Sequence, residues 1–557
     1  MKKKLSILVI MVLLVSFVFG CSKTSDTPNA PTEPSDTPST TPDTSSGSED
    51  GVLTEIPLPI VEEPIEIEVF IEIDASKVGV HTNDYNDILA YQELTKLTNV
   101  KLKFLHPPQG QASEQFNIML SSGDLPDLVY WSWLNVPGGP QKLIEDGLIL
   151  DLREYYEKYS PNLTKFLNEN PEVRKEIMTD EGSYYCYPYI QHNQVVNNSY
   201  GYMARADWLE KLGIEKPVTI DDWYNMLVAM RDNDPNGNGE KDEIPLVARG
   251  GVYNVDGALS QLSGAWGIHY KFYQEDGKVH FGPYEPQFKE YLKTMRKWIA
   301  EGLVDPDFAT QDQQLHDAKF MDGRGGVVRE GLGSGMDRYI MGLGGDPDKI
   351  TWLDFPVLNK GEKPKNFQGR NTSYAFSGAA ISATSKYPKE CAMWLDFHYS
   401  EQGHMILNFG VEGVTYNWVD GYPLLSDEIR NSPLGVSVAL GKYAPGASWE
   451  AFCQDSRVRE QRLLKWPIQR ETCDVWNASD TSGMLPPITP TTEESTRLAN
   501  IMGEINTFVS EKTLSYLLGE EDIDATWDQF ISTLKSMGIE EAIDIQQKAL
   551  ERYYKRQ

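Results

Sequence analysis

Strand and helix patterns alternate near the start of the chain, and this alternation constrains the fold more than any other feature. Residues 65–73 (Ile-Glu-Ile-Glu-Val-Phe-Ile-Glu-Ile) alternate apolar and polar side chains as a strand does, and residues 100–105 and 127–131 form two more strand patterns. Helical patterns cover residues 84–97 and 112–122 between them. This order predicts parallel crossovers and therefore an α/β fold.

The third of these strand patterns ends in two tryptophans. The segment reads Tyr130-Trp-Ser-Trp-Leu-Asn135. Ligand sites in parallel sheets lie beyond the carboxyl ends of the strands. The two rings either form a platform in a cleft or begin the next buried helix, and we favour the cleft.

Helices dominate the rest of the chain. Helical patterns cover residues 207–212, 219–230, 285–301 and 390–408, and most of the last 55 or so residues. No internal repeat is present, which argues against a propeller or a solenoid. A length of 557 residues suggests two to four lobes.

The first residues resemble an export signal. Three lysines precede an apolar run over residues 5–19, which at about 1.5 Å per residue is too short to span a bilayer of about 30 Å. Val18-Phe-Gly-Cys21 resembles a bacterial lipobox, although Phe is bulkier than usual at its position. We therefore expect a signal peptide over residues 1–20 and a lipid on Cys21. An ordinary cleaved signal with a coincidental cysteine is the alternative.

The segment that follows Cys21 is a predicted tether. Residues 22–50 are almost entirely Ser, Thr, Pro, Asp and Gly, so residues 21–50 should form a lipidated cysteine and a disordered linker. No later segment is apolar enough to span a bilayer, so the lipid would be the only membrane anchor. A net charge of −31 argues against a nucleic-acid partner.

The remaining cysteines do not suggest a metal site. Four follow Cys21, without Cys-x-x-Cys spacing, so a zinc site is not expected. Cys391 lies in a helical pattern and should be buried. Cys453 with Cys473 is the one disulfide pairing that we considered, and the sequence does not decide it.

Residues 232–243 carry alternating oxygen ligands of the kind that calcium prefers. The segment reads Asp-Asn-Asp-Pro-Asn-Gly-Asn-Gly-Glu-Lys-Asp-Glu. It fits the EF-hand pattern through Asp232, Asp234, Asn236, Gly237 and Glu243. A second register is also possible and uses Asp234, Asn236, Asn238, the Glu240 carbonyl, Asp242 and Glu243. The alternative to either is an acidic surface turn.

Several stretches, taken together, resemble one known family. Asp234-Pro-Asn-Gly-Asn-Gly-Glu-Lys-Asp-Glu-Ile-Pro245 resembles the calcium loop of the family 1 extracellular solute-binding proteins, most of all their alginate-oligosaccharide-binding and lipoprotein branch. Arg205-Ala-Asp-Trp-Leu-Glu-Lys-Leu-Gly213 agrees with this family. Weaker matches are Asp124-Leu-Pro-Asp-Leu128, Trp298-Ile-Ala-Glu-Gly-Leu-Val-Asp-Pro306 and Gly410-Val-Glu-Gly-Val-Thr-Tyr416.

The resemblance implies a fold and a function. It covers about residues 60 to 550 and implies two α/β lobes of the type II periplasmic-binding-protein kind, joined by crossing hinge segments. Residues 51–190 and 366–445 would form the N-terminal lobe, and residues 191–365 and 446–557 the C-terminal lobe with the calcium loop.

By the same resemblance the lobes close on a carbohydrate and deliver it to the permease of an ABC importer. We expect a monomer, anchored by lipid to the cell membrane on its extracellular or periplasmic side. The family's loop favours the second calcium register, with calcium in a structural role.

Carbohydrate binding also sets demands on side chains that can be sought in the sequence. A pyranose presents an apolar face to aromatic rings, and its hydroxyls need planar polar partners. Arg329, after a Gly-rich turn, could bind a hydroxyl or a sugar carboxylate. The aromatic candidates lie in loop-like or Gly-flanked stretches and are Trp131, Trp133, Trp266, Tyr416, Trp418 and Trp449.

A surface glycoside hydrolase is the alternative function. It would need two carboxylates at a set spacing, and among 82 acidic residues such a pair carries no information. The sequence has no His-Glu-x-x-His, no Gly-x-Ser-x-Gly and no phosphate loop. We therefore expect a binding protein without enzymatic activity.

Overall fold

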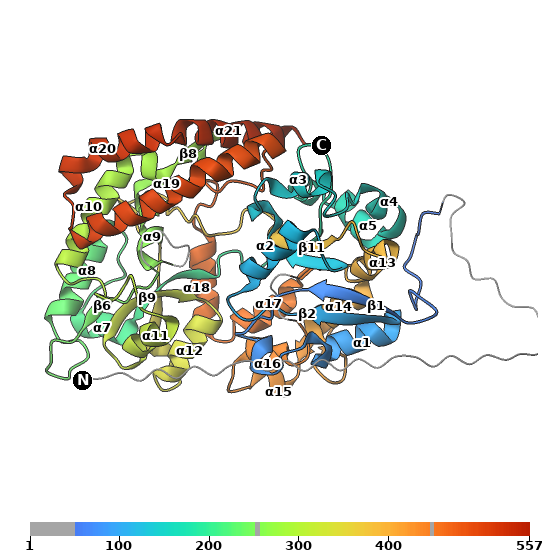
Figure 1. The fold of residues 1–557 in the computed structure, drawn as a ribbon. Helices are drawn as coiled ribbons and strands as arrows, with labels where there is room; N and C mark the ends of the chain where they lie inside the picture. Colours follow the sequence, from blue (N-terminus) through green and yellow to red (C-terminus); the bar gives the residue numbers. More distant parts are fainter. Residues whose placement is uncertain (1–50, 251–256, 446–449, 557) are drawn as a thin grey trace, which may run out of the picture. The chain divides into compact units, whose positions relative to one another are not determined.

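The structure contains two hydrophobic cores. It is a computed structural model that describes residues 51–250, 257–445 and 450–556. The first core takes buried side chains from Ile56 to Ile190 and from Tyr374 to Val458, and the second from Val196 to Phe367 and from Cys473 to Ala542. Each core is built on its own β-sheet, and Figure 1 shows the two sheets with their helices.

The first sheet begins as the sequence predicts. Its order is β2-β1-β3-β11-β4, and β1 is parallel to both β2 and β3. Two later strands complete it, because β11 pairs antiparallel with β3 on one side and with β4 on the other. The strands are β1 (Ile65–Phe70), β2 (Val100–Leu105), β3 (Leu128–Trp131), β4 (Tyr187–Ile190) and β11 (Tyr374–Ile381).

Helices enclose the first sheet. They are α1 (Leu89–Thr98), α2 (Ala112–Ser122), α3 (Gly139–Glu145), α4 (Arg153–Tyr159), α5 (Pro161–Glu169), α6 (Pro171–Glu176), α13 (Pro388–Phe397), α14 (Glu401–Phe409), α15 (Asp427–Arg430) and α16 (Val436–Gly441). The predicted helix over residues 390–408 is in fact two helices, α13 and α14. The two helices are separate because a new helix begins after Ser400, whose hydroxyl accepts a hydrogen bond from Gly403 N and caps α14.

The second sheet has the order β10-β5-β9-β6. Its strands are β5 (Tyr200–Arg205), β6 (Ile244–Leu246), β9 (Gly325–Gly331) and β10 (Ile350–Leu353). Its helices are α7 (Ala206–Leu212), α8 (Ile220–Asp232), α9 (Ala258–Leu262), α10 (Pro286–Ala300), α11 (Gln313–Met321), α12 (Ser334–Gly342) and α18 (Pro467–Asn477). Thr219 caps α8 as expected, since its hydroxyl accepts from Asp222 N at 3.1 Å.

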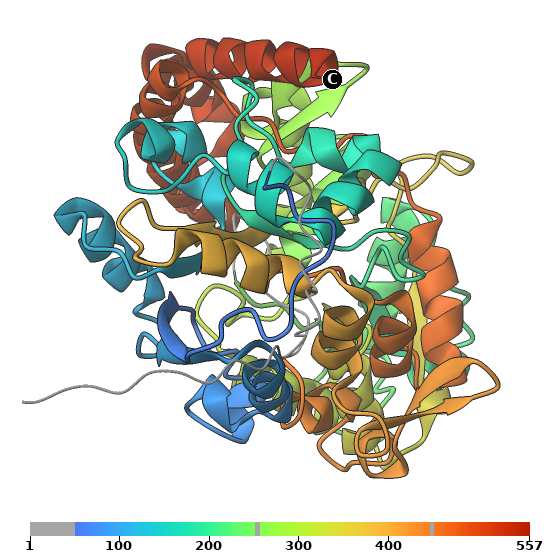
Figure 2. The ribbon, with the colours of Figure 1, turned by 90° about the vertical axis from the view of Figure 1, so that its right-hand side faces the viewer.

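Three C-terminal helices belong to the second core and confirm the predicted helical C-terminus. They are α19 (Thr492–Leu518), α20 (Ile523–Ser536) and α21 (Ile539–Lys555). In Figure 2 these red helices lie beside a green hairpin, β7 (Phe272–Glu275) with β8 (Lys278–Phe281). Gln547 of α21 joins the two, because its side chain accepts from Val279 N and donates to Gly277 O.

The chain passes between the two cores three times. The passages are residues 191–195, residues 368–373 and helix α17 (Ser456–Leu463), in which Val458 lies in the first core and Leu463 packs against the second. The boundaries differ from those expected at two places. Phe367 lies in the second core rather than the first, and Ala451 lies in the first core although residues 446–557 were assigned to the C-terminal lobe.

Two further expectations concern the cysteines and the membrane. Cys453 and Cys473 are free, so the pairing considered from the sequence is not formed, and Cys391 is buried as predicted. No helix within the described ranges combines the length and the apolar character that crossing a bilayer requires. The signal peptide, Cys21 and the linker lie outside the described residues.

A carboxyl group lies buried in the first core where the chain returns to it. Glu450 is 3% exposed, and its carboxyl accepts a hydrogen bond from the Tyr91 hydroxyl at 2.9 Å. Burial raises the pKa of Glu450 from 4.5 to about 8, and the nearby Asp74 carboxylate acts in the same direction. Glu450 is therefore mostly protonated at neutral pH.

This raised pKa predicts how stability depends on pH. Between pH 4.5 and 8 the unfolded chain releases a proton that folded Glu450 retains, so wild-type stability should fall as pH rises through that window. Glu450→Gln retains an acceptor for Tyr91 without this cost. Its melting temperature relative to wild type should therefore rise from pH 5 to pH 8. Exposed Glu511→Gln is the control, and parallel curves for Glu450→Gln and wild type would contradict the assignment.

Candidate ligand-binding site

A cavity of about 490 Å³ lies at the carboxyl ends of β1 and β3. Strand β1 leads into Ile71 and Glu72, and β3 ends at Trp131; all three line the cavity. This is the position at which a parallel sheet presents a ligand site. The lining combines the indole of Trp131 with polar side chains, namely Glu72, Ser113, Asn117, Ser132 and Asn135.

Packing holds the Trp131 ring in place. Phe116 of α2 stacks on it with ring centroids 4.1 Å apart and an interplanar angle of 12°, and Phe70 lies 6.4 Å away on β1. Trp131 is half-buried and packs against the first core. The ring is therefore fixed by the core and still borders the cavity, as a stacking platform must.

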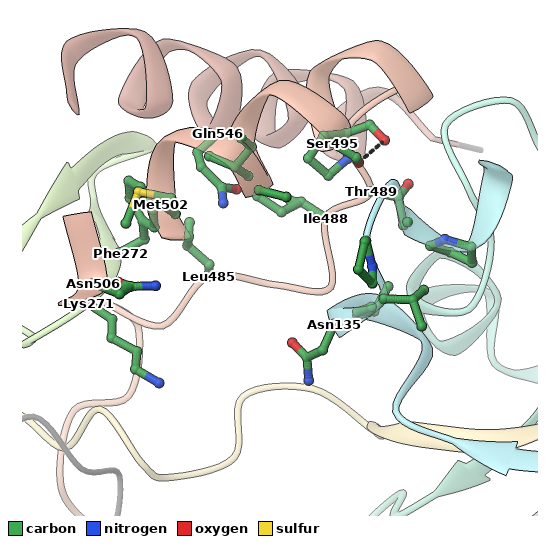
Figure 3. A pocket seen from close by; sticks show the side chains of 18 of the residues that line it. Asn135, Lys271, Phe272, Leu485, Ile488, Thr489, Ser495, Met502, Asn506 and Gln546 are labelled. Atoms are coloured by element: carbon green, nitrogen blue, oxygen red, sulfur yellow. Dashed lines mark hydrogen bonds between the residues drawn. The ribbon is translucent and has the colours of Figure 1, made fainter. Parts of the chain in front are cut away.

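A second cavity, of about 610 Å³, adjoins the first. Both are lined by Asn135, Val136 and Pro137, which follow β3. The other side of the second cavity comes from elements of the second core, including Phe272 on β7, Lys271 just before it and Met502 on α19. Figure 3 shows Asn135 and Lys271 on opposite sides of this space. The cavity thus lies between parts that belong to different cores.

Trp133 does not lie in the cleft. Its ring is completely buried in the first core, its Nε1 donates to Gly378 O at 2.9 Å, and it meets Phe116 edge-on. The sequence suggested that Trp131 and Trp133 act together. They do not, because the chain turns into a short 3₁₀ helix at Trp133 (Trp133–Asn135), which directs the second ring inward.

The other predicted ligand residues lie away from both cavities. Arg329 is 3% exposed on β9 and lies over the Tyr200 ring at 5.6 Å. Trp266 is half-buried against the second core, with Tyr291 at its edge. Tyr416 is buried against Phe409, on the hairpin of β12 (Tyr416–Val419) and β13 (Tyr422–Leu425).

The last two aromatic candidates, Trp418 and Trp449, are not placed in a cavity either. Trp449 lies outside the described residues. Trp418 is 45% exposed on the same hairpin, beside Arg457, and lines neither cavity. The residues that the sequence reasoning missed are polar: Glu72 and Asn117 line the first cavity. The rule that ligands bind at carboxyl ends of strands could have found Glu72, whereas no local pattern marks Asn117.

The loop over residues 232–243 folds around the side chain of Asp234. Its Oδ1 accepts from Gly237 N at 2.8 Å and Asn238 N at 3.1 Å, and its Oδ2 accepts from Gly239 N at 3.1 Å. Asn238 Oδ1 accepts from Glu240 N at 2.7 Å. These bonds hold the loop in a compact turn around the Asp234 carboxylate.

Three carboxylates of the loop lie close together. Burial raises the pKa of Glu243, and Asp242 and Asp234 raise it further through their charges. Glu243 Oε1 is buried without a hydrogen-bond partner. Asp232, by contrast, forms an ion pair with Arg231 in which Arg231 Nε lies 2.8 Å from Oδ1, and it takes no part in this cluster.

The donor set of the second register fits a cation. Asn236 and Asn238 each donate an amide hydrogen to Asp242 Oδ1, at 3.0 and 3.1 Å, so this carboxylate faces neutral N–H donors and no cationic side chain in these two bonds. If both amide groups turned over, their oxygens would be available to a cation beside Asp242. The same cation would then be the partner that the buried Glu243 oxygen lacks. In the part of the chain that the structure describes, no three His, Cys, Asp or Glu side chains are already arranged as a metal site.

Comparisons with known proteins agree with this architecture. Over 488 residues the chain is 27% identical to the fructooligosaccharide ABC transporter substrate-binding protein FusA of Streptococcus pneumoniae serotype 4, covering 84% of this chain and 88% of that one. It is 25% identical to lipoprotein LipO of Bacillus subtilis over 59% of this chain and 64% of LipO.

A solved structure and a family profile match as well. The crystal structure of alginate-binding protein AlgQ2 without calcium ion superimposes with a TM-score of 0.73 at 25% identity, covering 88% of this chain and 99% of AlgQ2. The profile of the bacterial extracellular solute-binding proteins matches residues 83–405. The two-lobed α/β fold expected from the sequence is thus confirmed, and the chain belongs to the family of bacterial extracellular solute-binding proteins.

Proposed function

We propose that this protein captures an oligosaccharide between its two cores and delivers it to an ABC importer. The observation that carries the proposal is Trp131, a ring fixed by Phe116 that borders a cavity with polar side chains around it. An apolar ring surrounded by amide, hydroxyl and carboxylate groups matches the two surfaces of a sugar. We further propose that the cores correspond to two lobes that close about the three passages.

The relatives support the class of ligand but not its identity. FusA is named for fructooligosaccharides and AlgQ2 for alginate, so similar chains take different sugars. FusA is named as the substrate-binding protein of an ABC transporter, and the matching family profile is that of solute-binding proteins. Oligosaccharide is therefore the ligand class that we propose here.

Two tryptophan variants test this site. Trp131→Ala should weaken oligosaccharide binding by about 1–3 kcal/mol, because it removes a fixed aromatic surface from the cavity, with only a modest change in melting temperature. Trp133→Leu should instead lower the free energy of unfolding by about 3 kcal/mol. Titration of tryptophan fluorescence with an oligosaccharide panel, alongside thermal melting, measures both effects. Unchanged affinity in Trp131→Ala would exclude this ring from the site.

We also propose that the loop over residues 232–243 holds a structural calcium ion in the second register. Asp234, Asn236, Asn238, the Glu240 carbonyl, Asp242 and Glu243 would supply its oxygens. The support is the clustering of Asp234, Asp242 and Glu243, the unpartnered Glu243 oxygen and the separate pairing of Asp232. Calcium would offset most of the negative charge of the three carboxylates and brace the end of α8 against β6.

The two registers differ in which aspartate binds calcium: the second register uses Asp242, and the EF-hand register uses Asp232. Asp242→Asn should abolish the rise in melting temperature that calcium gives to wild type, because it removes a charge from the ion site. Asp232→Asn is the matched control and should leave the calcium response intact. Differential scanning calorimetry of each variant, in calcium and in EDTA, measures this change in melting temperature. The reverse pattern would establish the EF-hand register, and no calcium response in wild type would refute the site.

We propose, finally, that a lipid on Cys21 anchors the protein outside the cell. The support is the lipobox-like Val18-Phe-Gly-Cys21 and the polar linker behind it, together with the similarity to lipoprotein LipO. The family is extracellular, so the anchor would keep the binding domain close to its permease.

A single substitution tests the anchor. Cys21→Ser should move the protein from the membrane to the soluble fraction, because no thiol is left to carry the lipid, while its melting temperature stays that of wild type. Fractionation followed by immunoblotting measures the distribution. Cys391→Ser is the control and should stay with the membrane. Continued membrane association of Cys21→Ser would show that something other than this lipid holds the protein.

A further inference from the structure

Three arginines from two of the passages between the cores act through their charges on the same tyrosine hydroxyl. Arg370 lies in the second passage, and Arg459 and Arg462 lie on α17. Burial raises the pKa of Tyr189 near the end of β4, and each of the three guanidinium groups opposes that rise, so all three lie within electrostatic range of its hydroxyl. Tyr189 is 3% exposed and belongs to the first core, so its hydroxyl is shielded from solvent.

These three arginines, the arginine cluster, are not neutralised by the protein. Among the described residues, no carboxylate lies within ion-pair distance of any of them. Arg459 donates to Gln454 Oε1 at 2.9 Å and Arg462 to Ser437 Oγ at 3.2 Å, both neutral acceptors. Arg459 Nε is buried with no hydrogen-bond partner at all.

Nearby acidic groups do not supply the missing charge. Asp74 is close enough to Arg462 to act on its pKa, but Asp74 Oδ2 lies 2.5 Å from Lys77 Nζ. Lys77 adds a further cation next to Arg459 and Arg462. Glu450 has its pKa raised to about 8 and is mostly uncharged.

The cost of this arrangement is considerable. Arg459 and Arg462 are 8% and 7% exposed, and buried like charges without counter-ions are strongly unfavourable. Burial, together with the charge of neighbouring Arg459, lowers the pKa of both Arg370 and Arg462 to about 10. Folding alone therefore gives no reason for these charges, whereas an anion bound among them would.

The segment after β1 links the arginine cluster to the sugar cavity. Ile71 and Glu72 line the cavity with Trp131, and Asp74, two residues after Glu72, acts through its charge on Arg462. An oligosaccharide that stacks on Trp131 can therefore extend toward the passages between the cores. A planar guanidinium pairs two hydrogen bonds with a planar carboxylate, which makes arginine a good partner for a uronic acid.

We infer that the ligand is an acidic oligosaccharide, and that a sugar carboxylate binds among Arg370, Arg459 and Arg462. The inference rests on the proposed carbohydrate function and specifies its ligand class. An inorganic anion would satisfy the same charges without any sugar, and the experiment must separate the two sources.

Paired ligands test the inference. Wild-type protein is titrated by calorimetry with trisaccharides of galacturonate, glucuronate and mannuronate, and with their neutral counterparts that carry a C6 hydroxymethyl group. At least one acid should bind tenfold or more tightly than its neutral partner. Binding of neutral members alone would overturn the inference and leave the carbohydrate function standing, whereas no binding by any member would count against both. Equal stabilisation by phosphate or sulfate at the same concentration would identify an adventitious ion only and would also overturn it.

Arginine variants locate the carboxylate. Arg370→Gln and Arg462→Gln should each weaken the acidic ligand at least tenfold and leave any affinity for the neutral partner within twofold. Their ligand-free melting temperatures should equal or exceed that of wild type, because each removes a buried, repelled charge. Arg497→Gln, which breaks an exposed pair with Glu541, is the control and should not change affinity. Lower melting temperatures with unchanged acid affinity would show a purely structural role and refute the assignment.

Discussion

The hydrogen bonds that join the three passages hold the two cores to each other. Gln454 is their centre: its side-chain oxygen accepts from Gln191 and Arg459, and its backbone oxygen accepts from Gln194 at 2.9 Å. Gln191 N also donates to Ser373 O at 2.8 Å, which adds the second passage. Because these groups are buried, each unmade bond would be costly, so the passages act as one unit.

Local patterns predicted the elements of the fold well, and the long-range pairings could not be predicted in the same way. The alternation over residues 65–131 fixes the parallel strands β1, β2 and β3, because each helix must return the chain to the same sheet edge. Strand β11 joins them from residues 374–381 and runs antiparallel. Nothing in its own pattern names its partner, and the return of Ala451 and Val458 to the first core is equally non-local.

The same limit explains the outcome for the site residues. Residue type and position after β3 pointed to both Trp131 and Trp133, and only the 3₁₀ turn decides which ring is buried. The prediction for Arg329 failed for a different reason. The Gly-rich segment before it suggested an accessible position, whereas Arg329 lies within β9 of the second sheet. The loop over residues 232–243 was more predictable, since its geometry depends on bonds between residues at most six positions apart.

An acidic chain can still bind an acidic sugar, because charge acts locally in salt solution. The net charge of −31 belongs to a surface whose field is screened within about 8 Å at physiological ionic strength. The arginine cluster lies in a buried region where screening is weak and each guanidinium acts at short range. The net charge would slow the approach of an anion, and the cluster would retain one that has entered. Overall charge therefore argues against polyanions that bind across a surface, such as nucleic acids, but not against a single carboxylate enclosed between the two cores.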